Sequence, residues 1–295
     1  MWAILTIGVF LTFRVLDIPD LTIEGTFPLG AAVTVVLINN GMNPLLAMLV
    51  CVVFGAVAGL ITGLLHTKFK IPAILAGILT QIALYSINIR IMSDKATVAL
   101  SEDSFKTMVT KLFPVGTAPN TISTVVGLTA CAVIIFLLYR FFGTELGCAV
   151  RATGSNQKMA RALGINTDAM INLCLALSNA LVALAGSLIA QFDYGSALVN
   201  MGQGTIVIGL ASVIIGEVIF VRKERNFGFK MAAVSAGAII YRTIIALALT
   251  LPWMKATDLK LITAIIVAFA LAIPAWKGKA GFKRKKFAPV EGVDE

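Results

Sequence analysis

The sequence has few charged residues for its length. Aspartate, glutamate, lysine and arginine make up 13% of the 295 residues, whereas hydrophobic residues make up 58%. Soluble globular domains typically carry about 25% charged residues, so this composition excludes an ordinary soluble domain. Apolar runs of about 20 residues recur along the chain, a length that matches a helix crossing the hydrocarbon core of a bilayer. The sequence therefore predicts an all-α, polytopic membrane bundle of roughly eight hydrophobic segments.

Residues that commonly hold metals are scarce as well. The chain has one histidine, His66, and its four cysteines are widely spaced without a CxxC pattern. A His/Cys metal site needs several such residues at short spacing, so we expect no metal and no cofactor. With no candidate Ser/His/Asp set, we also expect no enzymatic activity. The G-x-x-x-x-G-K-[ST] phosphate-binding loop is absent, so any use of ATP would require a separate ATPase subunit.

The positive charge of the chain is concentrated in loops. The formal net charge is +9. The basic residues gather in four segments, 66–70, 143–168, 222–230 and 277–286. Alternating spans place all four on one side, and such a bias marks the cytoplasmic face of a membrane protein. We therefore expect a membrane domain of residues 1–276, a basic cytoplasmic tail of residues 277–295, and no nucleic-acid partner.

The first membrane segment is interrupted. The apolar runs 2–16 and 27–38 are short for a span, and we expect Pro28 and Gly30 to break the second of them. Three carboxylates accompany this break, at Asp17, Asp20 and Glu24. Broken helices in a bilayer are tolerated where protein or a water-filled cavity covers the freed backbone groups, and they mark translocation paths. We therefore place these acids on a translocation path; the alternative is an acid-rich external loop.

A second interrupted element lies in the other half of the chain. Residues 200–205 form a glycine-broken entry to the run 205–221, which echoes the first break and suggests two related halves that meet at a central path. Asn200 and Gln203 in this entry are candidates for the path. Gln81 is a further candidate because it lies deep within another span.

Two charged residues also fall within apolar runs. Arg242 is in the middle of the run 231–251, where a guanidinium needs an acidic partner or a wet cavity, and we count it among the path residues. Its expected partner is one of the three carboxylates of the first break. Glu217 lies near the end of its run, and we expect it to pair with Arg222 and Arg225 at the membrane edge rather than to gate a path.

Small residues recur on one face of the run 45–65. Gly55, Gly59 and Gly63 follow one another at four-residue spacing. Such a face lets helices approach closely in a membrane, so these glycines are predicted to pack helices and to have no chemical role.

The segment 143–168 is polar, although long apolar runs lie on both sides of it. Charged residues at mid-bilayer cost a few kcal/mol each, so this segment must lie outside the lipid. Ser155 or Asn156 can cap a short helix, and Gly164 can end it in the left-handed conformation. A second cap at 166–168 precedes the next span. The sequence thus predicts a short, capped helix between two spans.

The predicted short helix has an apolar face. Met159, Ala162 and Leu163 share one side, whereas Lys158 and Arg161 lie toward the other. We expect this helix to dock onto a separate protein; the alternative is an amphipathic helix that packs on its own bundle.

The order of residues in this segment resembles a known family. The pattern G-x-x-x-R-A-x-G-x-N-x-x-x-A-x-x-x-G-I-N, residues 147–166 here, is similar to the coupling loop of membrane permeases in the branched-chain amino acid and ribose class of ABC importers. Residues 17–32 and 204–220 resemble two other segments of the same class. Where that class often has a second glycine, this chain has Glu217, which resembles a narrower branch.

The resemblance implies a set of partners. In that family the short helix docks into a groove of an ATP-binding subunit, an external binding protein delivers the solute, and two permease copies pair, here expected as a homodimer. A multi-pass location in the bacterial plasma (inner) membrane, surrounded by lipid, follows. The residues expected to contact the ATPase are Arg151, Gly154, Ser155, Asn156, Lys158, Met159, Ala160, Arg161, Leu163 and Gly164.

The expected function is the permease subunit of an ABC importer. The opening F-R-x-L-D-x-P-D-L-T-x-E-G, residues 13–25, resembles a branch associated with amino acids, including aromatic ones. The alternative is an autonomous secondary transporter or channel that uses the intramembrane carboxylates as ion sites. That alternative leaves the capped helix unexplained, and uptake measured without an ATPase subunit discriminates between the two.

Overall fold

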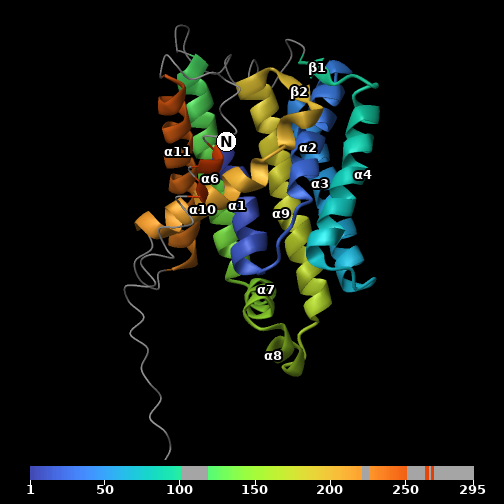
Figure 1. The fold of residues 1–295 in the computed structure, drawn as a ribbon, viewed down its shortest axis with the longest axis vertical. Coiled ribbons are helices and arrows are strands. Elements are labelled where there is room, and N and C mark those ends of the chain that lie inside the picture. The colour runs from blue at the N-terminus through green and yellow to red at the C-terminus, as the bar shows by residue number, and fades with distance from the viewer. Residues whose placement is uncertain (101–118, 221–225, 251–262, 266, 269–295) are drawn as a thin grey trace, which may run out of the picture.

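The computed structural model describes residues 1–100, 119–220, 226–250, 263–265 and 267–268, and these are almost entirely helical (Figure 1). Within them, six helices are long and apolar enough to cross a membrane. They contain α3 (Pro44–Thr67), α4 (Ala73–Ile91), α6 (Pro119–Phe142), α9 (Thr167–Ile189), α10 (Thr205–Phe220) and α11 (Phe227–Leu249), and the span of α10 begins earlier, at Val199. The predicted polytopic helical bundle is confirmed for this part of the chain. The predicted last run, 259–276, lies largely outside the described residues, and the tail 277–295 lies wholly outside them.

Two shorter apolar segments occupy the middle of the bundle. They are α1 (Trp2–Phe10), which continues into a π-helical turn η1 (Leu11–Val15), and α2 (Ile23–Asn39). The chain breaks between them as predicted: η1 ends at Val15, and Asp17 adopts a positive φ of 57° before α2 begins. In Figure 1 both segments, drawn in blue, lie between the α3–α4 side and the α10–α11 side.

The prediction that Pro28 and Gly30 interrupt the second run is wrong, because α2 continues through both. Proline has no N–H, so the carbonyl of Glu24 loses its helical hydrogen bond. Gly202 packs against that carbonyl so closely that a Cβ on Gly202 would lie 1.9 Å from the Glu24 oxygen. Gly30 packs against the backbone of Ala183 in the same manner. Packing by Gly202 thus shields the Glu24 carbonyl, which has no hydrogen-bond donor within α2.

Helix α9 crosses the centre of the bundle and is mostly buried. Its most extensive neighbour is α3, followed by α2. The glycines of α3 make this approach possible: a Cβ on Gly59 would lie 2.3 Å from the carbonyl oxygen of Leu175, and Gly55 and Gly63 also meet α9. The predicted packing role of these three glycines is confirmed, since any larger side chain would separate the two helices.

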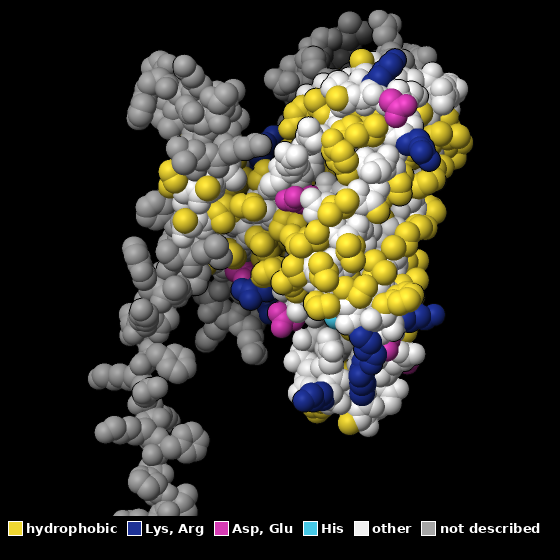
Figure 2. Space-filling view, turned by 45° about the vertical axis from the view of Figure 1, so that its right-hand side comes forward, with side chains coloured by type: hydrophobic (Ala, Val, Ile, Leu, Met, Phe, Trp, Pro, Cys, Tyr) yellow, Lys and Arg dark blue, Asp and Glu magenta, His cyan; other side chains and the backbone are white. Residues whose placement is uncertain are grey.

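The outer faces of α3 and α4 are apolar. Figure 2 shows hydrophobic side chains over most of the middle of this face, with most of the lysine and arginine side chains above and below them. Half-exposed or more exposed side chains on this surface include Leu49, Val53, Ile74 and Ile82. Such a belt belongs in contact with lipid, because water would not solvate it favourably.

Short elements mark the two ends of the bundle. At one end, which we call the α8 end, α7 (Glu145–Ser155) and α8 (Gln157–Ala162) protrude beyond the ends of the long helices (Figure 1). At the other, which we call the sheet end, β1 (Thr97–Ala99) and β2 (Ser196–Leu198) form an antiparallel pair. A π-helical turn η2 (Ala190–Tyr194) and a 3-10 helix η3 (Val199–Gly202) connect α9 through β2 toward α10.

Candidate functional site

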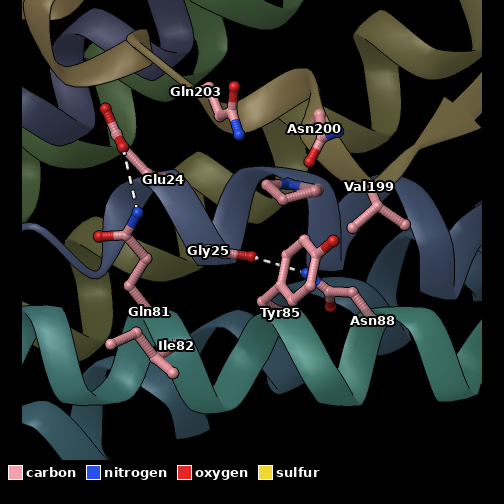
Figure 3. Close-up of a pocket in the computed structure, with 10 residues that line it drawn as sticks. Glu24, Gly25, Gln81, Ile82, Tyr85, Asn88, Val199, Asn200 and Gln203 are labelled. Carbon is pink, nitrogen blue, oxygen red and sulfur yellow. Dashed lines mark hydrogen bonds between the residues drawn. The ribbon is translucent and has the colours of Figure 1, made fainter. Parts of the chain in front are cut away.

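A cavity of about 240 Å³ lies between α2, α4 and η3 (Figure 3). It brings together four of the residues that the sequence placed on a path: Glu24, Gln81, Asn200 and Gln203. The remaining lining residues are Gly25, Pro28, Ile82, Tyr85, Asn88 and Val199. These positions come from both halves of the chain, so the cavity sits where the two interrupted elements meet.

The carboxylate of Glu24 joins the two interruptions. Its Oε1 accepts a hydrogen bond from the backbone N–H of Gly204 (2.9 Å), and its Oε2 accepts one from the side-chain amide of Gln81 (3.1 Å). Gly204 has a φ of +82°, a conformation that glycine adopts without strain. The turn before α10 therefore presents its N–H to an acid at the start of α2, 180 residues away in sequence.

Asn88 is a cavity residue that the sequence analysis did not select. Its side chain is fully buried, and its Nδ2 donates to the carbonyl of Gly25 (3.1 Å), as Figure 3 shows. Among the described residues, no donor reaches its Oδ1. A buried acceptor without a partner costs about 1–3 kcal/mol. A sequence signal existed, because Asn88 follows Gln81 by seven residues, two helical turns on the same face of α4.

The other two acids of the first break do not line this cavity. Asp20 is buried, where its Oδ2 accepts from Asn179 Nδ2 (2.7 Å) and its Oδ1 accepts from the backbone N–H of Thr22 (2.9 Å). It thus ties the turn before α2 to α9. Asp17 is exposed and lines a different pocket at the α8 end.

Arg242 does not meet the partner we predicted. Its guanidinium lies 4.3 Å from the centroid of the Trp2 ring, and the two ion pairs of the described residues involve neither Arg242 nor the acids of the first break. A cation over the face of an indole is stabilised by the ring quadrupole. The partner of Arg242 is therefore the Trp2 ring, not a carboxylate of the first break. Arg242 also does not line the cavity between α2, α4 and η3.

Glu217 forms an ion pair with Arg14 of η1. The Arg14 Nε donates to both carboxylate oxygens, at 3.0 and 2.9 Å. Arg222 and Arg225, the partners predicted from the sequence, lie outside the described residues. The pair joins α10 to the end of the first broken helix and lines the same pocket as Asp17 and Arg151.

The segment 143–168 forms two helices, whereas we predicted a single short one. Thr144 caps α7, and Asn156 caps α8 by accepting from the N–H of Met159 (3.1 Å). Gly164 then has a φ of +82° after α8, and Asn166 caps α9. The predicted caps at Asn156 and Asn166 and the left-handed Gly164 are confirmed, but Arg151, Gly154 and Ser155 belong to α7.

The residues proposed for ATPase contact differ in exposure. Met159 and Leu163 are 61% and 69% exposed, and Lys158 is exposed too. Ala160 is buried, and Arg161 is held by an ion pair with Asp168 (2.7 Å). Most of the predicted set is therefore open to a partner, and Ala160 is the buried exception.

Gly154 has a packing role within the chain. A Cβ at this position would lie 1.9 Å from the carbonyl oxygen of Val15, so α7 lies directly against η1. The α8 end thus touches the first broken helix through a contact that only glycine permits.

Comparison with known proteins agrees with this architecture. Residues 1–274 match the family described as branched-chain amino acid transport system, permease component. A tyrosine transport system permease protein of Clostridioides difficile is 41% identical over 270 residues, 92% of this chain and 86% of that protein. No solved structure matches the chain significantly.

Two further relatives match more weakly. An uncharacterised protein of Rickettsia prowazekii is 30% identical over 60% of this chain and 59% of its own length. A fructose import permease protein of Bifidobacterium longum is 28% identical over 50% of this chain and 44% of its own. Because the family match covers nearly the whole chain, and the bundle has the membrane spans that a permease requires, the chain belongs to the permease components of branched-chain amino acid transport systems.

Proposed function

We propose that this chain is the permease subunit of an ABC importer that carries an amino acid, with tyrosine or a related aromatic amino acid as the solute. The family and the 41% identical tyrosine permease support this assignment. The cavity around Glu24 then forms part of the translocation path. An external binding protein delivers the solute at the sheet end, and two copies of the chain pair in the plasma membrane of a bacterium.

The exposed apolar side chains of α8 carry the proposal. Met159 lies in the capped helix α8 and Leu163 directly follows it as the C-cap residue, and the bundle covers neither side chain. Exposed apolar groups held on a rigid element mark protein interaction sites. We assign this surface to an ATP-binding subunit, which places the α8 end and the carboxyl tail in the cytoplasm. In this proposal residues 1–276 form the membrane domain and residues 277–295 form the cytoplasmic tail.

Capture of the ATPase subunit by the solubilised chain tests the assignment. We expect Leu163→Asp to weaken capture by about 30-fold or more, the loss that follows when an interface hot spot worth about 2 kcal/mol is removed. Phe69→Asp is the matched control, because Phe69 is 70% exposed and lies between α3 and α4, outside α8. It should capture the ATPase normally.

Transport provides the second readout. In liposomes that contain the chain, the ATPase and the binding protein, tyrosine uptake should require ATP and should be lost in Leu163→Asp. A chain that accumulates tyrosine without an ATPase subunit would overturn the proposal and favour a secondary transporter driven through the intramembrane carboxylates.

A further inference from the structure

We propose that a cavity at the junction of α6, α7 and α11 binds the headgroup of an anionic phospholipid, whose phosphate is held by the guanidinium groups of Arg140 and Arg151. The cavity has a volume of about 790 Å³ and lies at the α8 end of the bundle. We call it the arginine pocket. The inference goes beyond the proposed function, because it concerns the lipid around the permease and involves neither the solute nor the ATPase.

The first observation is the charge of the arginine pocket. Its described charged lining residues are both arginines, Arg140 and Arg151, and none of its described lining residues is an aspartate or a glutamate. Neither of the two ion pairs among the described residues includes either arginine. A neighbouring pocket shares Arg151 but also contains Asp17 and Glu217. Of the two, the arginine pocket is lined by charge of one sign, and such a cleft concentrates ions of the opposite sign.

The second observation is the way in which Arg151 is positioned. Its guanidinium carbon lies 5.7 Å from the centroid of the Phe227 ring, and its Nη2 donates to Cys148 Sγ (3.7 Å). The Phe227 ring packs in turn against Phe142, with ring centroids 4.6 Å apart. A guanidinium has five N–H donors, and the described hydrogen bonds use one of them. The remaining donors are available to phosphate oxygens, which guanidinium groups bind in a bidentate geometry.

The third observation is the location of the pocket, which favours lipid as the source of the anion. The membrane-spanning stretches Ile122–Phe142 and Phe227–Ala248 both end at this pocket. On the membrane side of Arg140, α6 exposes Phe136 and Leu137, which are 64% and 59% exposed. Acyl chains can lie along these side chains while the headgroup reaches the arginines. Basic pockets between membrane spans bind phospholipid headgroups in this way.

Two other anions compete with this assignment. Free phosphate has no acyl chains, so its binding would not use the apolar surface of α6. A carboxylate of the ATPase subunit would be expected to contact Arg151, which belongs to the predicted coupling residues. Arg140, however, lies in the last turn of a membrane span, where a lipid headgroup is the nearer anion.

Native mass spectrometry of the purified full chain in detergent tests the inference without any partner. The chain is titrated with a phosphatidylglycerol and, separately, with a phosphatidylcholine of the same acyl chains, which carries a phosphate but no net charge. We expect the phosphatidylglycerol to bind at least about tenfold more tightly, because each arginine near an anionic headgroup contributes roughly a fivefold gain. Arg140→Gln should reduce this preference about fivefold, and the double variant Arg140→Gln, Arg151→Gln should abolish it.

The matched control is Arg90→Gln. Arg90 is also an exposed arginine in the last turn of a membrane-spanning helix, but it lies at the sheet end of α4. This variant should keep the wild-type preference. Equal binding of the two lipids to the wild-type chain would overturn the inference without any variant, and so would a preference that survives in the double variant.

Two further measurements separate the competing anions. Inorganic phosphate added in excess should leave phosphatidylglycerol bound, and displacement of the lipid by phosphate would show a site for a free anion instead. ATPase capture by the same variants in detergent is the second measurement. If capture is lost in the double variant while its lipid preference is unchanged, the arginines bind the ATPase and the lipid assignment is wrong.

Discussion

The cavity around Glu24 and the surface around α8 have opposite polarities, and neither polarity is the one that its surroundings favour. The cavity gathers a carboxylate and amide side chains within membrane-spanning helices, where polar groups are costly. Helix α8 and its C-cap residue expose Met159 and Leu163 outside the lipid belt, where apolar groups gain nothing from contact with water. Each region therefore exposes groups that its immediate surroundings do not favour, as the proposed function would require.

The two regions also differ in the sequence separation of the contacts that position them. Glu24 is fixed by contacts from α4 and from the turn before α10, so its position depends on segments far apart in sequence. The helix α8 is fixed by its own cap at Asn156 and by the left-handed Gly164. Substitutions should therefore affect stability strongly at the cavity and weakly at α8, and the predictions below test that contrast.

The largest effect should come from the contact that joins α7 to η1 at the α8 end. Gly154→Ala places a Cβ against the Val15 carbonyl, and overpacking of this kind costs about 1–3 kcal/mol or more. We expect a lower thermal unfolding temperature and reduced uptake. Gly143→Ala is the matched control: it lies in the same segment, and its added Cβ would meet no atom closer than 3.4 Å. Equal stability of the two variants would disprove a direct link between α7 and η1.

A slightly smaller loss is expected at the cavity. Glu24→Ala leaves the Gly204 N–H and the Gln81 amide without their acceptor, which should lower the free energy of unfolding by about 1–3 kcal/mol. Thermal unfolding in detergent measures this loss. Glu24→Gln retains one acceptor oxygen, which can serve one of the two donors, and should recover part of the stability. If Glu24→Gln is as unstable as Glu24→Ala, the negative charge of Glu24, rather than its hydrogen bonds, stabilises the contact between α2 and the turn before α10.

The ion pair at the α8 end should matter less. The Arg14 side chain is 51% exposed, and pairs open to solvent are typically worth about 0–1 kcal/mol because water and salt screen them. Arg14→Gln should therefore lower the unfolding temperature slightly, and the difference from wild type should shrink as salt is added. A large loss that is independent of salt would show that the pair is shielded in the membrane.

The smallest effect on stability is predicted for Leu163, although its substitution should weaken ATPase capture strongly. Leu163 is 69% exposed, so Leu163→Ala should change the free energy of unfolding by no more than about 0.5 kcal/mol. ATPase capture by the same variant should nevertheless fall. A marked loss of stability would mean that the side chain packs on its own bundle, which was the alternative for this helix.

Some features of this protein follow from the sequence alone because they depend on neighbouring residues. The apolar runs predict the spans, since a length of about 20 residues is set by the bilayer. The caps at Asn156 and Asn166 and the turn at Gly164 follow from side chains and φ angles within a few residues. The glycine face of α3 is visible in the spacing of its residues, although the spacing does not identify α9 as its partner.

Other features were decided by the tertiary structure because they join residues distant in sequence. Glu217 pairs with Arg14, 203 residues away, and Arg242 lies over Trp2. Helix α2 runs through Pro28, and Gly202 of another segment packs on the freed carbonyl. Hydrophobicity fixes that a helix enters the membrane, but the rotation and tilt of each helix fix which polar groups meet. The contact of Asn88 with the Gly25 carbonyl therefore appears only when α2 and α4 are placed together.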